Sequence, residues 1–211
     1  MTTFIYIVGL FFGLTIIYLF YIRPWYLHWG ATNKEVELSL PGDSIVVKTD
    51  FNATRGIAIN SSPELIWRWI IQIGSNRAGW YSIDWIDNAG IKSSEKILPQ
   101  FQKIEIGQFI PFTPDHKNGM WVKEFKEHNY ILWVDKVGKA TWLWYLFPTD
   151  NGNTRLLTRL RTKYKWKGFW IIYYLLYDVG DIMMMSHCMK GIRRRAENEK
   201  CRSLEHKISI Q

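Results

Sequence analysis

Alternation of apolar and polar residues between positions 108 and 162 most constrains the fold of this chain. A period of two residues is typical of β-strands that bury one face. The gaps between the alternating segments are short and carry turn-forming residues such as Gly119 and Asn153. Short gaps permit hairpins, so we expect an antiparallel meander. The expected strands are 108–112, 120–126, 130–136, 141–148 and 154–162.

A short strand and a helix are expected before the meander. The strand is the alternating segment 54–60. Ser62 followed by Pro63 is a typical helix start, because Ser caps the first turn and Pro needs no partner there. Apolar side chains then recur at helical spacing as far as Ile73, and Gly74 can end the helix.

A long helix is expected after the meander, from about residue 168 to about residue 198. Asp178 and Asp181 interrupt its apolar run, so we do not expect a second membrane span. This order of elements buries its apolar surfaces best when a curved antiparallel sheet wraps around the long C-terminal helix. The sequence therefore predicts an α+β helix-grip fold with an apolar cavity between the sheet and that helix.

The first segment of the chain, residues 4–22, contains no charged side chain. As a helix it rises about 1.5 Å per residue, close to the roughly 30 Å of a bilayer's hydrocarbon core. Arg23 and Trp25 follow where an interfacial anchor is expected. A cleaved signal peptide is the alternative, but no basic residue precedes the segment and it ends in bulky residues. We therefore predict an uncleaved transmembrane helix.

These patterns divide the chain into four parts. They are a transmembrane anchor at 1–23, a linker or collar at 24–53, a helix-grip domain at 54–198 and a polar tail at 199–211. Arg23 and Lys34 follow the apolar segment, and no Lys or Arg precedes it. The positive-inside rule then predicts a single-pass membrane protein with its domain in the cytoplasm.

Charge and aromatic content indicate the surroundings of the domain. The net charge is +8, which beside an apolar segment favours an anionic lipid surface over nucleic acid. A soluble domain with surplus surface lysine is the alternative. The 12 Trp, 11 Tyr and 11 Phe suit a membrane-facing protein or a wide apolar pocket. Cys188 and Cys201 are the only cysteines, so no disulfide framework is expected.

The run Arg-Ala-Gly-Trp-Tyr-Ser-Ile-Asp-Trp at 77–85 is the longest recognisable motif. The shorter motifs around it are Trp29-Gly30-Ala31-Thr32 with Glu35, Pro41-Gly42-Asp43, Thr54-Arg55-Gly56-Ile57, Pro63-Glu64, Trp67, Trp69, Gln72-Ile73-Gly74, Asp87-Asn88, Thr154-Arg155-Leu156, Arg159, Met185 and 191–197. Over about residues 29–198 they resemble the polyketide cyclase-related group of the SRPBCC or START-like superfamily. The resemblance implies a helix-grip fold and a hydrophobic ligand cavity. It implies no activity, because most members are uncharacterised and fold does not determine function.

Catalytic chemistry has little support in the sequence. There is no HExxH, GxSxG, P-loop or Rossmann glycine motif, and the five histidines lack metal-ligand spacing. We therefore expect neither a metal nor a cofactor. Asp84 and Asp87 could form an acid/base pair on one helix face, or satisfy backbone groups instead. Arg77 could bind an anionic head group or form a structural salt bridge.

Strand parity and helix spacing predict which side chains face the cavity. In the strand 154–162, Leu156 and Leu160 share one face, whereas Arg155 and Arg159 share the other. We expect the leucine face to line the cavity, and the arginine face to be solvated or to contact phospholipid. The predicted ligand-binding residues are Trp69, Ile73, Trp80, Tyr81, Asp84, Trp144, Leu156, Leu160, Met184 and Met185.

The strand 141–148 is unusual because both of its faces are apolar. A strand in a one-sided sheet normally alternates apolar and polar residues. The outer face is therefore expected to meet the linker or the membrane, or the strand is buried on both sides.

Three functions remain open for such a chain. It could bind or sense a lipid or polyketide-like molecule at the membrane, act as a cyclase- or hydrolase-like enzyme on an apolar substrate, or be a non-catalytic partner of another membrane protein. Polar groups that converge in the cavity would favour an enzyme, and a filled core with an exposed aromatic patch would favour an interaction partner. The lack of catalytic motifs favours a binding module. The sequence indicates neither the ligand nor the oligomeric state.

Overall fold

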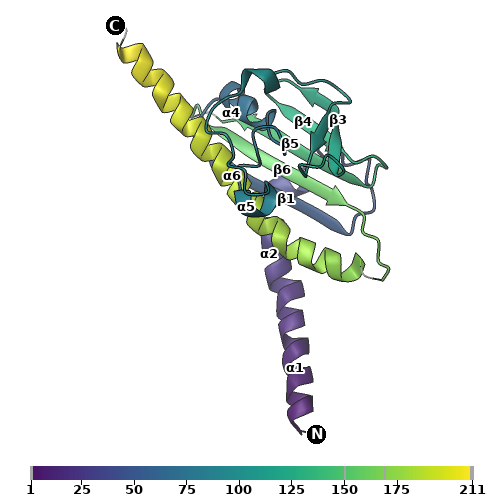
Figure 1. Ribbon diagram of the computed structural model, residues 1–211. Helices are drawn as coiled ribbons and strands as arrows, with labels where there is room; N and C mark the ends of the chain where they lie inside the picture. Colours follow the sequence, from purple (N-terminus) through teal and green to yellow (C-terminus); the bar gives the residue numbers. More distant parts are fainter. Residues whose placement is uncertain (1, 150, 169, 210–211) are drawn as a thin grey trace.

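The computed structural model describes residues 2–149, 151–168 and 170–209 (Figure 1). The strands are β1 Phe51–Ile59, β2 Phe109–Pro111, β3 Gly119–Lys126, β4 Tyr130–Val134, β5 Ala140–Pro148 and β6 Thr154–Thr162. The α-helices are α1 Thr2–Ile17, α2 Arg23–Leu27, α3 Asn33–Glu37, α4 Pro63–Ile70, α5 Asp84–Asp87 and α6 Trp170–Ser209. A π-helical segment, η1 Tyr18–Ile22, joins α1 to α2, and a 3₁₀ turn, η2 Pro99–Phe101, follows α5.

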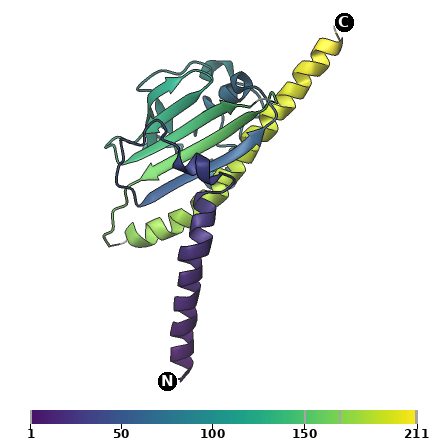
Figure 2. The ribbon, with the colours of Figure 1, turned by 180° about the vertical axis from the view of Figure 1, so that it is seen from behind.

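The six strands form one antiparallel sheet in the order β1-β6-β5-β4-β3-β2. Strands β2 to β6 pair with their neighbours in chain order, which confirms the predicted meander. Strand β1 pairs with β6 and completes the sheet on the other side. The sheet is curved, and α6 crosses one of its faces, as Figures 1 and 2 show from opposite sides. The predicted α+β helix-grip fold is therefore confirmed.

Helix α4 begins where the sequence signals place it, but it ends at Ile70, three residues before the predicted end at Ile73. The Ser62 hydroxyl accepts a hydrogen bond from the Leu65 amide at 3.4 Å, and Pro63 occupies the first turn. Beyond the helix, Gly74 has a φ of +134°, a conformation that L side chains rarely adopt. The chain can therefore turn sharply there and lead into the segment that carries the longest motif.

The core lies between the inner face of the sheet, α4 and the middle of α6. Trp69 of α4 and Trp133 and Trp144 of the sheet are fully buried in it. Met189 and Ile192 of α6 pack into the same cluster and are also fully buried. Large aromatic side chains dominate such cores because each one buries roughly 150–250 Å². The middle of α6 is thus fixed by packing, whereas its first half covers a different region of the sheet.

The linker predicted at 24–53 forms a collar over the outer face of the sheet, opposite α6 (Figure 2). Arg159 of β6 is 3% exposed at its side chain and pairs with Asp43 of the collar at 2.7 Å. Arg155 pairs with Glu35 of the collar at the same distance. The prediction of a solvated or phospholipid-contacting arginine face was therefore wrong. Strand parity identified the face, but it could not show that the collar folds over it.

The collar also explains why β5 is apolar on both faces. Leu143 on the outer face packs with Leu132 of β4 and Leu40 of the collar, and all three are buried. Beside them, the rings of Tyr145 and Phe147 lie 4.4 Å apart. The outer face of β5 thus meets the linker, which was one of the expected alternatives.

The N-terminal helical segment, α1 to α2, projects away from the sheet (Figure 1). Its apolar side chains are exposed along α1, including Phe4, Phe11 and Phe12. In the described part of the chain, Tyr6–Leu27 is the one helical stretch long and apolar enough to cross a membrane. A signal sequence near the N-terminus meets the same criterion, so membrane insertion stays a prediction.

The base of this segment is held on the domain by a polar network. The Arg23 guanidinium pairs with Asp178 of α6 at 2.9 Å. The hydroxyl groups of Tyr26 and Tyr164 also donate to Asp178. Arg55 of β1 donates to the Tyr26 carbonyl at 3.0 Å. The N-terminal helix is therefore fixed to both the sheet and α6, and α2 belongs structurally to the domain.

Helix α6 is longer than the sequence predicted. It continues through Ser209, so the predicted polar tail at 199–211 is helical as far as that residue. Residues 210–211 lie outside the described residues. Figure 1 shows α6 changing direction next to α5, between its green first part and its yellow second part. This bend carries the first part of α6 along the sheet at a different angle from the part that packs in the core.

Candidate functional site

A cavity of about 730 Å³ lies between the inner face of the sheet and the first half of α6. The sheet contributes Trp142 and Leu160, the segment around α5 contributes Trp80 and Asp87, and α6 contributes Met184. This volume is within the roughly 300–1,000 Å³ that small-molecule pockets occupy. The cavity is therefore the leading ligand-site candidate in the described part of the chain.

One wall of the cavity is a rigid group of aromatic rings. Trp80 stacks on Trp142 with an interplanar angle of 4° and a centroid distance of 5.7 Å. Phe112 meets both rings edge-on, at 5.4 Å from Trp80 and 5.9 Å from Trp142. The Trp142 indole N–H donates to the Thr158 hydroxyl at 2.8 Å. This hydrogen bond orients the ring, so the wall is formed before any ligand enters.

Asp87, the last residue of α5, also lines the cavity. Both of its oxygens are buried, and neither has a hydrogen-bond partner among the described residues. The nearby Ser82 hydroxyl donates to the Met184 carbonyl at 3.0 Å. Burial raises the pKa of Asp87 to about 6; the Ser82 hydroxyl opposes this rise, and the negative charge of Asp84 adds to it. Asp87 is therefore a buried acid without a cationic partner among the described residues.

A second acid, Asp181 of α6, lines the cavity but is paired. Its carboxylate lies 2.6 Å from the Arg55 guanidinium, and both side chains are almost fully buried. Removing one partner of such a pair costs about 3–5 kcal/mol, because the other charge is left uncompensated. This ion pair thus closes the end of the cavity that adjoins the polar network at the base of the N-terminal helix.

The cavity offers little for covalent or metal chemistry. In the described part of the chain, no group of three or more His, Cys, Asp or Glu side chains could hold a metal ion. Cys188 lines the cavity, but complete burial raises the pKa of its thiol and so disfavours the nucleophilic thiolate. No His lines the cavity within the described residues, so the thiol has no imidazole base there.

Four of the predicted ligand-binding residues meet in this cavity: Trp80, Leu160, Met184 and Met185. They come from three different elements that the sequence placed on the inner side of the fold. Leu160 lies on the face of β6 that strand parity predicted, and Thr162 on the same face also lines the cavity. Contact of these four with a ligand stays a prediction, now with a defined geometry.

Four other predicted residues lie in the core instead of the cavity lining: Trp69, Ile73, Trp144 and Leu156. Trp144 and Leu156 have the predicted inward parity, but they lie farther along their strands, where the sheet packs against the core cluster. Parity predicts the face of the strand on which a side chain lies, but it does not predict where along the strand the cavity begins or ends. Trp69 and Ile73 follow the apolar stripe of α4, which packs into the same core.

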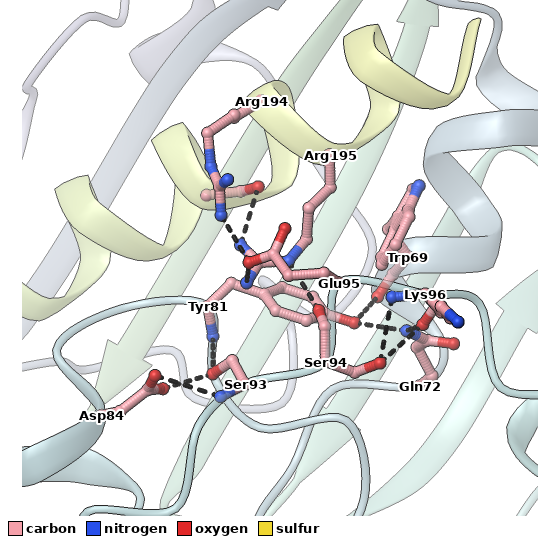
Figure 3. Close-up of polar contacts among 11 residues, drawn as sticks. Trp69, Gln72, Tyr81, Asp84, Ser93, Ser94, Glu95, Lys96, Arg194 and Arg195 are labelled. Atoms are coloured by element: carbon pink, nitrogen blue, oxygen red, sulfur yellow. Dashed lines mark hydrogen bonds and ion pairs between the residues drawn. The ribbon is translucent and has the colours of Figure 1, made fainter. Parts of the chain in front are cut away.

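The remaining two, Tyr81 and Asp84, belong to a polar scaffold beside the cavity (Figure 3). The Tyr81 hydroxyl donates to the Trp69 carbonyl at 3.2 Å and accepts from the Gln72 side chain at 2.7 Å. The Asp84 carboxylate accepts hydrogen bonds from both the backbone amide and the hydroxyl of Ser93. The structure therefore shows Asp84 satisfying a loop, which was the alternative to an acid/base role.

A polar hollow of about 330 Å³ lies outside this scaffold, against α6. Arg194 and Arg195 both donate to Glu95 at 2.6 Å, and the Arg195 guanidinium lies 4.4 Å from the centre of the Tyr81 ring. Figure 3 shows these charged groups directed at one another. Tyr81 and Asp84 also line this hollow, which has less than half the volume of the cavity and whose two arginines already pair with Glu95.

Arg77, at the start of the longest motif, takes neither of its expected roles. Its guanidinium donates to the carbonyls of Ile71 and Ile73, at 2.7 and 3.1 Å, and lies 4.6 Å from the centre of the Phe101 ring. Carbonyls after the last helical turn lack helical partners, and a basic side chain can satisfy them. Arg77 therefore holds the end of α4 in place.

Several cavity residues were missed by sequence reasoning. Trp142 has the same parity as Trp144, but only Trp144 is among the predicted ligand-binding residues. The sequence suggests Asp87 only as the partner of Asp84, and Asp181 only as an interruption of an apolar run. An acidic residue within an apolar helical stretch was the one sequence signal that could have pointed to the cavity, because burial of an acid requires a partner or a function.

Comparison with known proteins gives fold-level likeness alone. No family profile and no curated protein matches the chain. Protein NE0264 from Nitrosomonas europaea is 13% identical, with a TM-score of 0.46 over 71% of this chain and 96% of that chain. Protein EF2215 from Enterococcus faecalis is 14% identical, with a TM-score of 0.38 over 78% and 95%.

The Polyketide_cyc-like protein Cgl2372 from Corynebacterium glutamicum is 13% identical, with a TM-score of 0.35 over 74% of this chain and 93% of that chain. Likenesses this distant carry no argument about ligand or activity. The topology and cavity of the chain itself define its class. It is an α+β protein with a helix-grip arrangement and an internal, aromatic-lined cavity.

Proposed function

We propose that this chain is a single-pass membrane protein whose SRPBCC-like domain binds a hydrophobic small molecule. The observation that carries the proposal is the cavity, about 730 Å³ in volume, with its stacked Trp80 and Trp142 wall. Burial of a ligand there contributes about 0.8 kcal/mol for each methylene group removed from water. A modest apolar body therefore suffices for micromolar binding.

Binding without turnover fits the site better than catalysis does. Of the possible acid/base pair, Asp84 is held by Ser93 outside the cavity lining, so Asp87 lines the cavity without its predicted catalytic partner. The cavity thiol of Cys188 is kept protonated by burial. General acid/base and nucleophilic catalysis need a positioned partner for the reacting group, and these two groups lack one in the described part of the site.

Two features beside the domain support a membrane location for it. The apolar helix projects from one side of the domain, and Trp25 near its base is 65% exposed. The segment between β6 and α6 lies on that same side and exposes Lys165, Trp166 and Lys167 (Figure 1). Aromatic and basic side chains are typical of the head-group region, particularly beside anionic lipids. We place the domain in the cytoplasm, following the positive-inside rule.

Co-purification tests the ligand proposal. The full chain is extracted in a mild detergent, and native mass spectrometry compares the wild type with Met184→Arg and Leu160→Arg. We expect a bound apolar molecule on the wild type and at least a tenfold loss of it in both variants, because each introduces a charge into the cavity.

Met183→Arg is the matched control. Met183 precedes Met184 on α6, but its side chain is 51% exposed. This variant should keep the bound molecule. Retention of the molecule by all three variants, or its absence from the wild type, would contradict the proposal.

The membrane location is tested separately in intact cells. The mature chain should keep residues 1–23, resist extraction by alkaline carbonate and expose its domain to protease only after the cells are opened. An N-terminus near residue 25 would show a cleaved signal peptide, and digestion from outside would reverse the orientation.

A further inference from the structure

The charged residues in the cavity lining are all acidic. In the described part of the chain, the lining contains no Lys, Arg or His. It contains three acids: Asp87, Asp135 and Asp181. The whole chain has a net charge of +8, so a cavity lining whose charged residues are all acidic differs from the rest of the chain. The charge of the lining therefore restricts which ligands can enter.

Two of the three acids already have partners. Asp181 pairs with Arg55 at 2.6 Å. Asp135 accepts hydrogen bonds from the backbone amides of Lys139 and Ala140, at 2.6 and 2.9 Å, and so closes the turn between β4 and β5. Both acids thus stabilise the fold, and neither needs a ligand.

Asp87 is the exception. Both of its oxygens are buried without a hydrogen-bond partner among the described residues. The groups around it supply no positive charge: Asp84 on the same helix is itself an acid, and Cys188 from α6 is a neutral buried thiol. The neighbouring Ser82 hydroxyl lowers the pKa of Asp87 and so offsets part of the effect of burial, but it is uncharged. A buried carboxylate without a cationic partner destabilises the folded domain unless a ligand supplies the positive charge.

We infer that the ligand of this cavity is an amphiphilic amine, with its apolar body against the aromatic wall and its protonated nitrogen on Asp87. The inference rests on the proposed function and narrows it to a ligand class. An ammonium group supplies both the positive charge and the N–H donors that the Asp87 oxygens lack. The faces of the Trp80 and Trp142 rings also attract cations. A fatty acid would instead bring a second negative charge to Asp87.

The acidity of Asp87 fits this role. With a pKa of about 6, the carboxyl group is mostly ionised at pH 7.5 and can pair with an amine. At pH 5 it is mostly protonated and offers little charge. Burial raises the pKa of Asp181 as well, but the Arg55 guanidinium 2.6 Å away opposes that rise, and the Cys188 thiol stays neutral. Asp87 is thus the acid of the lining that changes charge between the two conditions without a cationic partner.

The test uses three water-soluble compounds that share one apolar body: 4-phenylbutylamine, 4-phenylbutan-1-ol and 4-phenylbutanoate. Each is titrated at pH 7.5 into the full chain in lipid nanodiscs, and the tryptophan fluorescence is corrected with empty nanodiscs. We expect the amine to bind about tenfold tighter than the alcohol, and the acid to bind more weakly than the alcohol.

Two variants locate the effect. Asp87→Asn should weaken binding of the amine about tenfold and leave the alcohol within about twofold. Glu127→Gln removes an exposed acid in the turn between β3 and β4 and should change neither affinity. As a readout that needs no variant, lowering the pH from 7.5 to 5 should weaken binding of the amine to the wild type about tenfold but not that of the alcohol.

The outcomes separate this inference from the proposed function. Equal affinities for the three compounds, tightest binding of the acid, or an amine affinity unchanged in Asp87→Asn and at pH 5 would overturn the amine assignment. The cavity would then still bind apolar molecules. Failure of all three compounds to bind, together with a wild-type chain that co-purifies with no apolar molecule, would overturn both proposals.

Discussion

Two buried charges on opposite sides of the sheet, Arg159 and Asp87, lie in contrasting surroundings. On the outer face, Arg159 has Asp43 and three backbone carbonyls of the collar as partners. On the inner face, Asp87 is buried at the cavity without a partner among the described residues. The outer charges stabilise a fixed structure, whereas the inner charge destabilises the empty domain. Buried polar groups normally have partners, so the exception indicates the functional face.

The largest expected effect is on the outer face. Arg159→Ala should lower the free energy of unfolding by about 3–5 kcal/mol, because it leaves Asp43 and the collar carbonyls without their donor. Chemical denaturation of the full chain in nanodiscs, followed by tryptophan fluorescence, measures the change. Arg193→Ala, at an exposed position of α6, is the control and should change stability by less than about 0.5 kcal/mol. Equal effects of the two variants would remove the contrast between the faces.

A smaller effect of opposite sign is expected on the inner face. Asp87→Asn should raise the free energy of unfolding by about 1–2 kcal/mol at pH 7, because it removes an uncompensated charge from a partly buried site. The gain should shrink towards zero as the pH falls to about 4. The reason is that the pKa of Asp87 is higher in the folded state than in the unfolded state, so its ionisation destabilises the folded state. Once the carboxyl group is protonated in both states, this penalty is absent. Destabilisation of the variant at pH 7 would show that Asp87 has a structural partner.

The smallest effect concerns the ion pair between Arg155 and Glu35. Burial alone would raise the pKa of Glu35, but hydrogen bonds from Arg155 and Thr32 outweigh it and hold the pKa below its usual value. Glu35→Gln should therefore cost about 1 kcal/mol at pH 7, and the difference from the wild type should disappear in acid. Glu37→Gln, at an exposed position of the same short helix, is the control. A cost that persists below pH 4 would assign the effect to packing.

Sequence reasoning located the elements well because their signals are local. The alternation of side chains predicted every strand of the meander to within a few residues, and Ser62 and Pro63 predicted the start of α4. It located the site less well. Trp142 and Trp144 have the same parity and the same chemistry, yet only Trp142 lines the cavity. What separates them is their position along a curved sheet, which depends on contacts distant in the sequence.

By itself, the sequence determined the α+β class, the antiparallel meander, the long final helix and the inward face of β6, because residue periodicity and capping act over a few neighbouring positions. Only the tertiary structure decided that the collar neutralises the outer arginines and that Arg23 joins the N-terminal helix to α6. It alone also showed that Asp181 has a cationic partner and that Asp87 has none among the described residues. The physical reason is that a charge is stabilised by what lies within a few ångströms of it, and those partners come from positions more than a hundred residues apart.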